Sequence, residues 1–157
     1  MADAEITGGT IFWLMKRAFS LQRRSVEEGM RAHGVSAAQA GVLTQLLEAP
    51  GLSSSDLARR LVITAQAVTV AVATLEEKGF VERIADPSHG RIRRCFLTKT
   101  GRRVAERCVA DAMEIEQKFL ALLDAEERAT LAELLSLLLR EQPPEPPGSS
   151  GGTRLQG

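Results

Sequence analysis

Two closely spaced helix starts constrain the fold of this 157-residue chain more than any other feature. Ser53 is a good N-cap for a short helix that buries Leu57, Ala58 and Leu61. Thr64 is the next good N-cap, so only a few residues separate the two helices. Such close coupling of two short helices is typical of a helix-turn-helix.

A predicted β-hairpin follows these helices. Residues 80–84 and 94–97 are apolar enough to form strands, and Asp86-Pro87-Ser88-His89-Gly90 between them is strong turn chemistry. A helix-turn-helix followed directly by a hairpin predicts a winged helix-turn-helix. We therefore expect a mainly α fold with a small wing of two or three β-strands.

Helical periodicity and caps place the other helices on both sides of this unit. We expect helices at about 11–30, 37–48, 99–123 and 125–140, with Ser36, Thr98 and Asp124 as N-caps of the last three. Gly34 and Gly79 are the predicted helix stops. Residues 1–10 are expected to form a flexible arm, and the Pro/Gly/Ser-rich residues 142–157 a disordered tail.

Composition fits a packed soluble domain, with 44% apolar and 25% charged residues and a net charge of zero. The charge is unevenly distributed along the chain, because residues 83–107 carry a charge of +6 and residues 111–145 a charge of −6. We find no secretory signal and no apolar run of 18 residues, and the two cysteines form no disulfide or zinc pattern. We expect a cytoplasmic protein with reduced thiols.

The helix at 65–78 has two different faces on a helical wheel. Val68, Ala71, Val72 and Leu75 fall on one side and should face the core. The opposite side is small, partly polar and, in its first half, uncharged, and carries Gln66, Thr69, Val70 and Ala73. Such a face suits a major groove, where Gln pairs with adenine, Thr donates or accepts, and Ala or Val touches a thymine methyl. The alternative is a helix buried against a partner subunit.

Three arginines follow the predicted turn. Strand alternation sends Arg91 and Arg93 to one face and Arg94 to the other. An arginine near a hairpin tip suits a minor groove or a phosphate, although an exposed edge strand also favours charge. The backbone amides of Ser53–Ser55, at a helix start, are candidates to bind phosphate.

These residues resemble the MarR family of bacterial transcription regulators. The resemblance rests on Leu57-Ala58, on Thr64 through Val68-Thr69, on the run Leu75–Arg83, and on Arg91 followed by Leu97-Thr98 and Gly101. It covers about residues 10–140. It implies a single domain at 11–141, with a winged-helix lobe at 35–98 and dimerisation helices at 11–33 and 99–141.

The resemblance also implies a function. Members are homodimers that place the second helix of the motif in the major groove and the wing in the minor groove of a pseudopalindromic operator. They usually repress nearby genes, and a small molecule or oxidant often releases the DNA. The residues that we expect to contact DNA are Ser53, Ser55, Thr64, Gln66, Ala67, Thr69, Val70, Arg91 and Arg93.

One position departs from the family pattern. Members commonly have Asp two residues before the wing arginine, where it orients the arginine by an ion pair; here the residue is His89. A protonated imidazole would instead repel Arg91, and His89 can make DNA binding sensitive to pH or be a solvated turn residue. The wing must therefore be held in some other way, or held less firmly.

Regulation has two candidates in the sequence. Cys95 lies among arginines, which would favour its thiolate, whereas Cys108 falls on a core stripe; we interpret both as structural. Trp13 and Arg17 lie one helical turn apart, and an aromatic plate beside a guanidinium suits an aromatic acid as effector. The alternative places Trp13 in the dimer interface and Arg17 in solvent.

No catalytic, cofactor or metal motif stands out, since the chain has no GxSxG, Walker or HExxH sequence and its histidines are isolated. A sequence-specific DNA-binding repressor is therefore the leading hypothesis. A winged-helix module that binds protein instead of DNA, and a small enzyme acting in a dimer cleft, are the alternatives.

Overall fold

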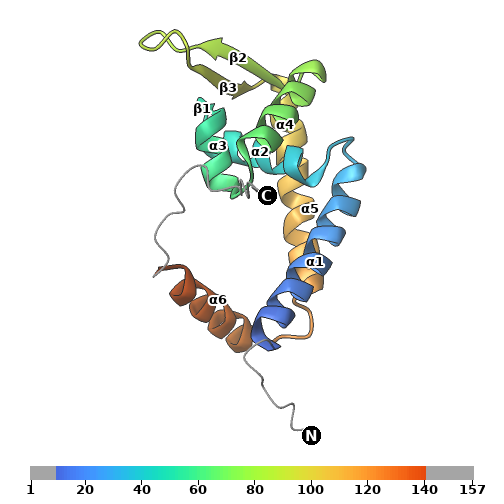
Figure 1. Ribbon diagram of the computed structural model, residues 1–157. Helices are drawn as coiled ribbons and strands as arrows, with labels where there is room; N and C mark the ends of the chain where they lie inside the picture. The colour runs from blue at the N-terminus through green and yellow to red at the C-terminus, as the bar shows by residue number, and fades with distance from the viewer. Residues whose placement is uncertain (1–9, 141–157) are drawn as a thin grey trace, which may run out of the picture. The chain divides into compact units, whose positions relative to one another are not determined.

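The computed structural model describes residues 10–140 and confirms a mainly helical fold with a small wing (Figure 1). Its elements are α1 (Thr10–Arg31), α2 (Ala37–Glu48), β1 (Leu52–Ser53), α3 (Ser54–Leu61), α4 (Ala65–Glu77), β2 (Val81–Ala85), β3 (Arg93–Leu97), α5 (Lys99–Phe119) and α6 (Ala125–Arg140). The chain divides into two compact units after Phe119, and α6 belongs to the second. The predicted arm at 1–10 and tail at 142–157 lie outside the described residues, except that Thr10 is the first residue of α1.

The sheet has three antiparallel strands in the order β1-β3-β2. Strands β2 and β3 form the wing, which extends away from the helices in Figure 1. The very short β1 pairs with β3 through Leu52–Cys95 and Ser53–Arg94. Of the two alternatives that the sequence left open, the structure therefore has the three-stranded sheet.

The core lies where α2, α3 and α4 pack together and against β3 and α5. Val42, Leu43, Leu46, Leu57 and Leu75 are fully buried there. The apolar face of α4 is thus anchored from several sides, which fixes the direction of its other face.

The predicted caps are present. Ser36 and Gln39 form a capping box at α2, and Ser53 and Asp56 form one at α3 with Asp in place of the usual Glu or Gln. The Thr64 hydroxyl accepts a hydrogen bond from the Ala67 N–H at 3.1 Å. Gly34 and Gly79 end their segments with positive φ angles of 69° and 70°, as predicted.

A tight junction joins the wing to α5. The Thr98 hydroxyl donates to the Gly79 carbonyl and accepts from the Gly101 amide. A Cβ atom at position 101 would lie 1.8 Å from the Phe80 carbonyl oxygen, so only glycine fits there. This close approach explains why Gly101 accompanies the Leu97-Thr98 pair in the sequence.

Two predictions about the long helices are wrong. Helix α5 ends at Phe119 rather than at residue 123, because residues 120–123 form a turn and the Asp124–Glu127 capping box starts α6. Phe119, which the apolar stripe at 99–123 predicts to face inward, is exposed. No single described helix is long and apolar enough to cross a membrane; α3 and α4 pass that test only as a pair bent by 116°, with the apolar face of α4 buried.

The turn between α3 and α4 contains a residue that sequence reasoning missed. Val62 has φ 52° and ψ 44°, the left-handed conformation, and its side chain is 89% exposed. A β-branched residue in this conformation costs roughly 1–2 kcal/mol. The exposed side chain returns almost no burial energy to offset that cost.

We predict that Val62→Asn raises the free energy of unfolding by about 1 kcal/mol, because Asn tolerates the left-handed region far better than Val. Urea denaturation monitored by circular dichroism measures the change. Val70→Asn is the matched control, since Val70 is also exposed but lies within helix α4. Equal effects of the two substitutions would contradict a conformational origin.

Candidate nucleic-acid interface

Helix α4 presents the face that its sequence predicted. Val68, Ala71, Val72 and Leu75 are all buried, whereas Gln66, Thr69 and Val70 are exposed. Ala67 and Ala73, which the sequence also places there or next to it, are half-buried. The exposed face is therefore low and, in its first half, uncharged, and it can approach another surface closely.

Hydrogen bonds fix the start of this face. The Thr64 hydroxyl caps the helix, and the Thr69 hydroxyl donates to the Ala65 carbonyl at 2.9 Å, which leaves its oxygen lone pairs available as acceptors. Thr64, Gln66, Ala67 and Val70 also line an open hollow of about 390 Å³ between α4 and the start of α2. In the single chain this face is open to solvent; its burial against a partner subunit is the alternative that the sequence left open.

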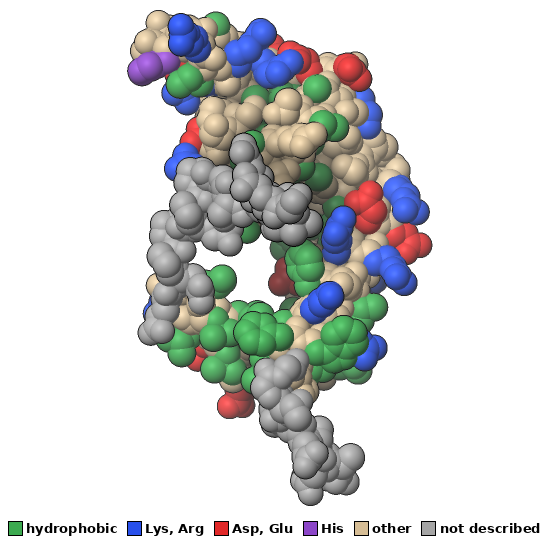
Figure 2. All heavy atoms as spheres, viewed as in Figure 1, with side chains coloured by type: hydrophobic (Ala, Val, Ile, Leu, Met, Phe, Trp, Pro, Cys, Tyr) green, Lys and Arg blue, Asp and Glu red, His purple; other side chains and the backbone are tan. Residues whose placement is uncertain are grey.

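The strand register puts one row of wing side chains on the side of α4. Val81 and Cys95 are buried on that side of the sheet, and Arg83 pairs directly with Cys95. Arg93 pairs with Ala85 and therefore lies on the same side. Figure 2 shows Lys and Arg side chains gathered over the hairpin. The side of the wing that carries Arg83 and Arg93 therefore faces α4, whose Glu76 accepts a hydrogen bond from Arg83.

The wing arginines differ in their partners. Arg91 is exposed and makes no hydrogen bond or ion pair with any described residue, whereas Arg93 donates to the Arg83 carbonyl at 3.3 Å. Arg94, on the other face as predicted, donates from Nε to Asp86 Oδ2 at 2.6 Å and from Nη1 to the Gly51 carbonyl at 3.0 Å. The Arg94 guanidinium therefore makes its hydrogen bonds within the protein.

Two carboxylates pair with wing arginines, and sequence reasoning named neither as a partner. Asp86 is only 6% exposed; its hydrogen bonds from the Ser88 amide and from Arg94 lower its pKa. Glu76 on α4 accepts from Arg83, which lowers the pKa of Glu76 and raises that of Arg83. The sequence feature that could have pointed to these carboxylates is the cluster of arginines in the wing, because arginines packed against a sheet need hydrogen-bond acceptors.

The start of α3 corrects one expectation. The Ser53 amide donates to Asp56 Oδ2 at 3.1 Å and the Ser53 hydroxyl donates to the same oxygen at 2.6 Å. These donors are already used, and the Asp56 carboxylate would repel a phosphate. The phosphate-binding hypothesis is therefore confined to the amides that follow, next to the exposed Ser55.

Cys95 and Cys108 are both buried, and burial raises the pKa of each thiol. The expectation that neighbouring arginines favour a Cys95 thiolate is wrong, because desolvation outweighs the charge of Arg83. Among residues 10–140, no group of three or more His, Cys, Asp or Glu side chains could hold a metal ion.

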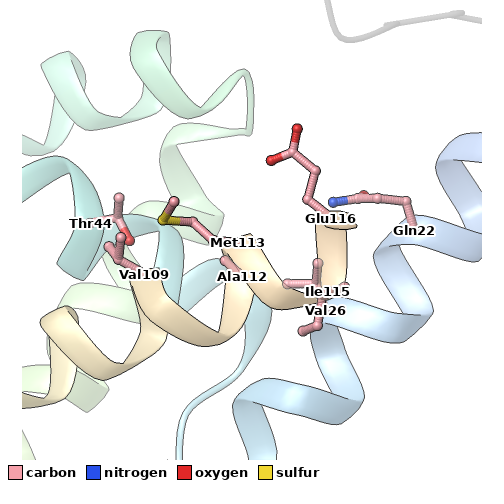
Figure 3. A pocket seen from close by; sticks show the side chains of 8 residues that line it. All are labelled: Gln22, Val26, Thr44, Val109, Ala112, Met113, Ile115 and Glu116. Atoms are coloured by element: carbon pink, nitrogen blue, oxygen red, sulfur yellow. The ribbon is translucent and has the colours of Figure 1, made fainter. Parts of the chain in front are cut away.

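A hollow of about 260 Å³ lies between α1, α2 and α5 (Figure 3). Val26, Val109, Ala112, Met113 and Ile115 provide an apolar lining, and Gln22, Thr44 and Glu116 provide polar groups. Figure 3 shows the polar ends of Gln22 and Glu116 on the same side of this hollow. Trp13 and Arg17, the ligand residues suggested by the sequence, are exposed and do not line it.

The helix pair α3–α4, the exposed face of α4 and the basic wing define a winged helix-turn-helix DNA-binding protein. A sequence model described as MarR family matches residues 33–92. The chain is 32% identical to the HTH-type transcriptional repressor Rv2887 of Mycobacterium tuberculosis over 126 residues, covering 80% of this chain and 91% of the relative. The chain therefore belongs to the MarR family of transcriptional regulators, which are DNA-binding proteins and not enzymes.

Solved structures agree with this assignment. A mutant MarR from E. coli complexed with operator DNA superposes with a TM-score of 0.76 at 28% identity, over 82% of this chain and 93% of that one. The M. tuberculosis protein Rv2887 in complex with p-aminosalicylic acid superposes with a TM-score of 0.68 at 30% identity, over 80% and 95% of the two chains.

Proposed function

We propose that the chain is a homodimeric repressor that binds a pseudopalindromic operator and is released by a small aromatic ligand. Helix α4 would enter the major groove, and the wing would lie in the adjacent minor groove. The observation that carries the proposal is the exposed, uncharged face of α4 beside exposed wing arginines. Similarity to repressors, and to a structure that holds operator DNA, supports the same assignment.

Apolar surface supports a second copy of the chain as partner. The first turns of α1 expose Ile11, Phe12, Trp13, Leu14 and Met15, with Phe12 76% exposed (Figure 2). Helix α6 also exposes leucines along its length, namely Leu131, Leu134, Leu135, Leu137, Leu138 and Leu139. Stable soluble monomers rarely expose apolar patches of this extent, and such patches usually mark a protein–protein interface. A homodimer that buries both surfaces also provides the two α4 helices that a pseudopalindrome needs, about 34 Å apart.

The proposed contacts divide by role. Gln66, Ala67, Thr69 and Val70 would read base edges, because a low helix face brings amide, hydroxyl and methyl groups within reach of the groove. Thr64, Ser55, Arg91 and Arg93 would contact the sugar–phosphate backbone or the minor groove, which sets affinity and register rather than sequence. Ser53 would act indirectly, by capping α3.

We propose the hollow between α1, α2 and α5 as the effector site. It lies between the helix pair α1–α5 and α2, and α2 packs against α3 and α4, so a bound ligand would change how the DNA-binding helices are held. The relative that holds p-aminosalicylic acid supports an aromatic ligand. The lining contains Glu116 and no basic residue, so an acid would have to direct its carboxylate away from Glu116.

We predict that Arg91→Ala weakens binding to matched and scrambled operators alike, whereas Gln66→Ala and Thr69→Ala mainly weaken binding to the matched operator. A lost base contact should cost about 1–3 kcal/mol of discrimination, and a lost phosphate contact should reduce the salt slope by about one. Fluorescence anisotropy at several salt concentrations measures both quantities.

The matched control is Arg103→Ala, which removes the same charge from an exposed position on α5. It should change affinity much less than Arg91→Ala. Equal losses on both DNAs for every variant would refute the division of roles. Affinity that does not fall with salt would favour the protein-interaction module instead.

We predict that Met113→Trp prevents release of the operator by p-aminosalicylic acid, because the larger side chain fills the hollow from its rim. Met113 is 62% exposed, so the substitution should not disturb the core. Titration of the ligand into the protein–DNA complex measures release, and Met113→Leu is the conservative control. If Met113→Trp binds DNA normally and is released at the same ligand concentration, the effector lies elsewhere.

A further inference from the structure

The four arginines of the wing strands and turn fall into two classes. Arg83 and Arg94 each form an ion pair with a carboxylate, whereas Arg91 and Arg93 form none with any described residue. Sequence alternation alone does not predict this division. It raises the question of what the two paired arginines do.

Arg83 joins the wing to α4. Its Nε donates to Glu76 Oε2 at 2.9 Å, and its Nη2 donates to the same oxygen. Arg83 lies near the middle of β2, and Glu76 lies in the last turn of α4. This ion pair therefore fixes the α4 side of the sheet to the end of the proposed DNA-reading helix.

Arg94 joins the wing to the turn before β1. Its guanidinium bridges the nearly buried Asp86, at the base of the wing turn, and the Gly51 carbonyl. The Asp86 backbone also holds the wing turn, since its N–H donates to the Ile92 carbonyl at 2.8 Å. Arg94 is paired in register with Ile84, next to the Arg83–Cys95 pair, so the two ion pairs lie on opposite faces of the hairpin.

We propose that Arg83–Glu76 and Arg94–Asp86 are positioning pairs that fix the angle of the wing to α4, leaving Arg91 and Arg93 to contact DNA. This inference rests on the proposed function. The Asp86 pair holds the base of the wing turn, at the outer end of β2, and supplies the constraint that His89 cannot. The low pKa of Asp86 and Glu76 keeps both carboxylates ionised at neutral pH.

The sign of a mutational effect tests the proposal. Removal of a carboxylate beside a DNA-binding surface ordinarily strengthens binding, because it removes repulsion of the phosphates. The positioning role predicts the opposite for Glu76→Gln and Asp86→Asn, about a five- to thirtyfold loss of operator affinity. Glu82→Gln is the matched control, since Glu82 is an exposed carboxylate on the same hairpin and forms no ion pair with a described residue.

A second measurement does not depend on DNA. Hydrogen exchange of the amides in residues 85–93 should be faster in Asp86→Asn than in the unmodified protein, and unchanged in Arg91→Ala. Arg94→Lys serves as a further variant, because it keeps the charge but cannot bond Asp86 and Gly51 together as the fork does. It should reproduce the faster exchange and the loss of affinity even if Asp86→Asn folds poorly.

The outcomes separate this proposal from the proposed function. If Arg91→Ala weakens DNA binding while Glu76→Gln, Asp86→Asn and Arg94→Lys bind as well as Glu82→Gln or better, the positioning role is wrong and the DNA-binding role stands. If Arg91→Ala leaves affinity unchanged, the proposed function is wrong. Faster exchange in the wing together with weaker operator binding supports the positioning pairs.

Discussion

Burial of one side of α4 is the constraint on which the rest of the structure depends. Val68, Val72 and Leu75 are fully buried against the other helices of the core, so the helix can neither rotate nor slide without exposing them. Each such side chain contributes roughly 1.5–3 kcal/mol when buried. The buried face therefore fixes the orientation of the opposite face, with Gln66 and Thr69, whose side chains do not pack into the core.

The wing also needs a fixed orientation, but it has little apolar packing to provide one. It is a small hairpin that contributes Val81 and Cys95 to the core at its base, and its outer half has no core to pack against. Hydrogen-bonded ion pairs take the place of apolar packing there, with Glu76 on one face and Asp86 on the other. Two carboxylates are thus placed among the arginines of this basic element. The net positive charge that remains belongs to the residues nearest the tip.

Much of this arrangement follows from the sequence, for identifiable reasons. The caps at Ser36, Ser53 and Thr64 depend on residues three positions apart, and the two faces of α4 depend on helical periodicity, so both are local patterns. Long-range partners are not local: the pairing of Arg94 with Asp86 and Gly51 depends on the strand register. The left-handed Val62 and the early end of α5 were also missed. Valine normally avoids the left-handed region, and the apolar residues 120–123 continue the helical pattern past Phe119 although they form a turn before the Asp124–Glu127 capping box.

The central claim is that two copies of the exposed face of α4 enter successive major grooves of one operator. Methylation interference at guanine N7, which lies in the major groove, tests this most directly. The account predicts two clusters of interfering guanines related by a twofold axis, with their centres about 10 base pairs apart. A single cluster, or interference confined to adenine N3 in the minor groove, would contradict it.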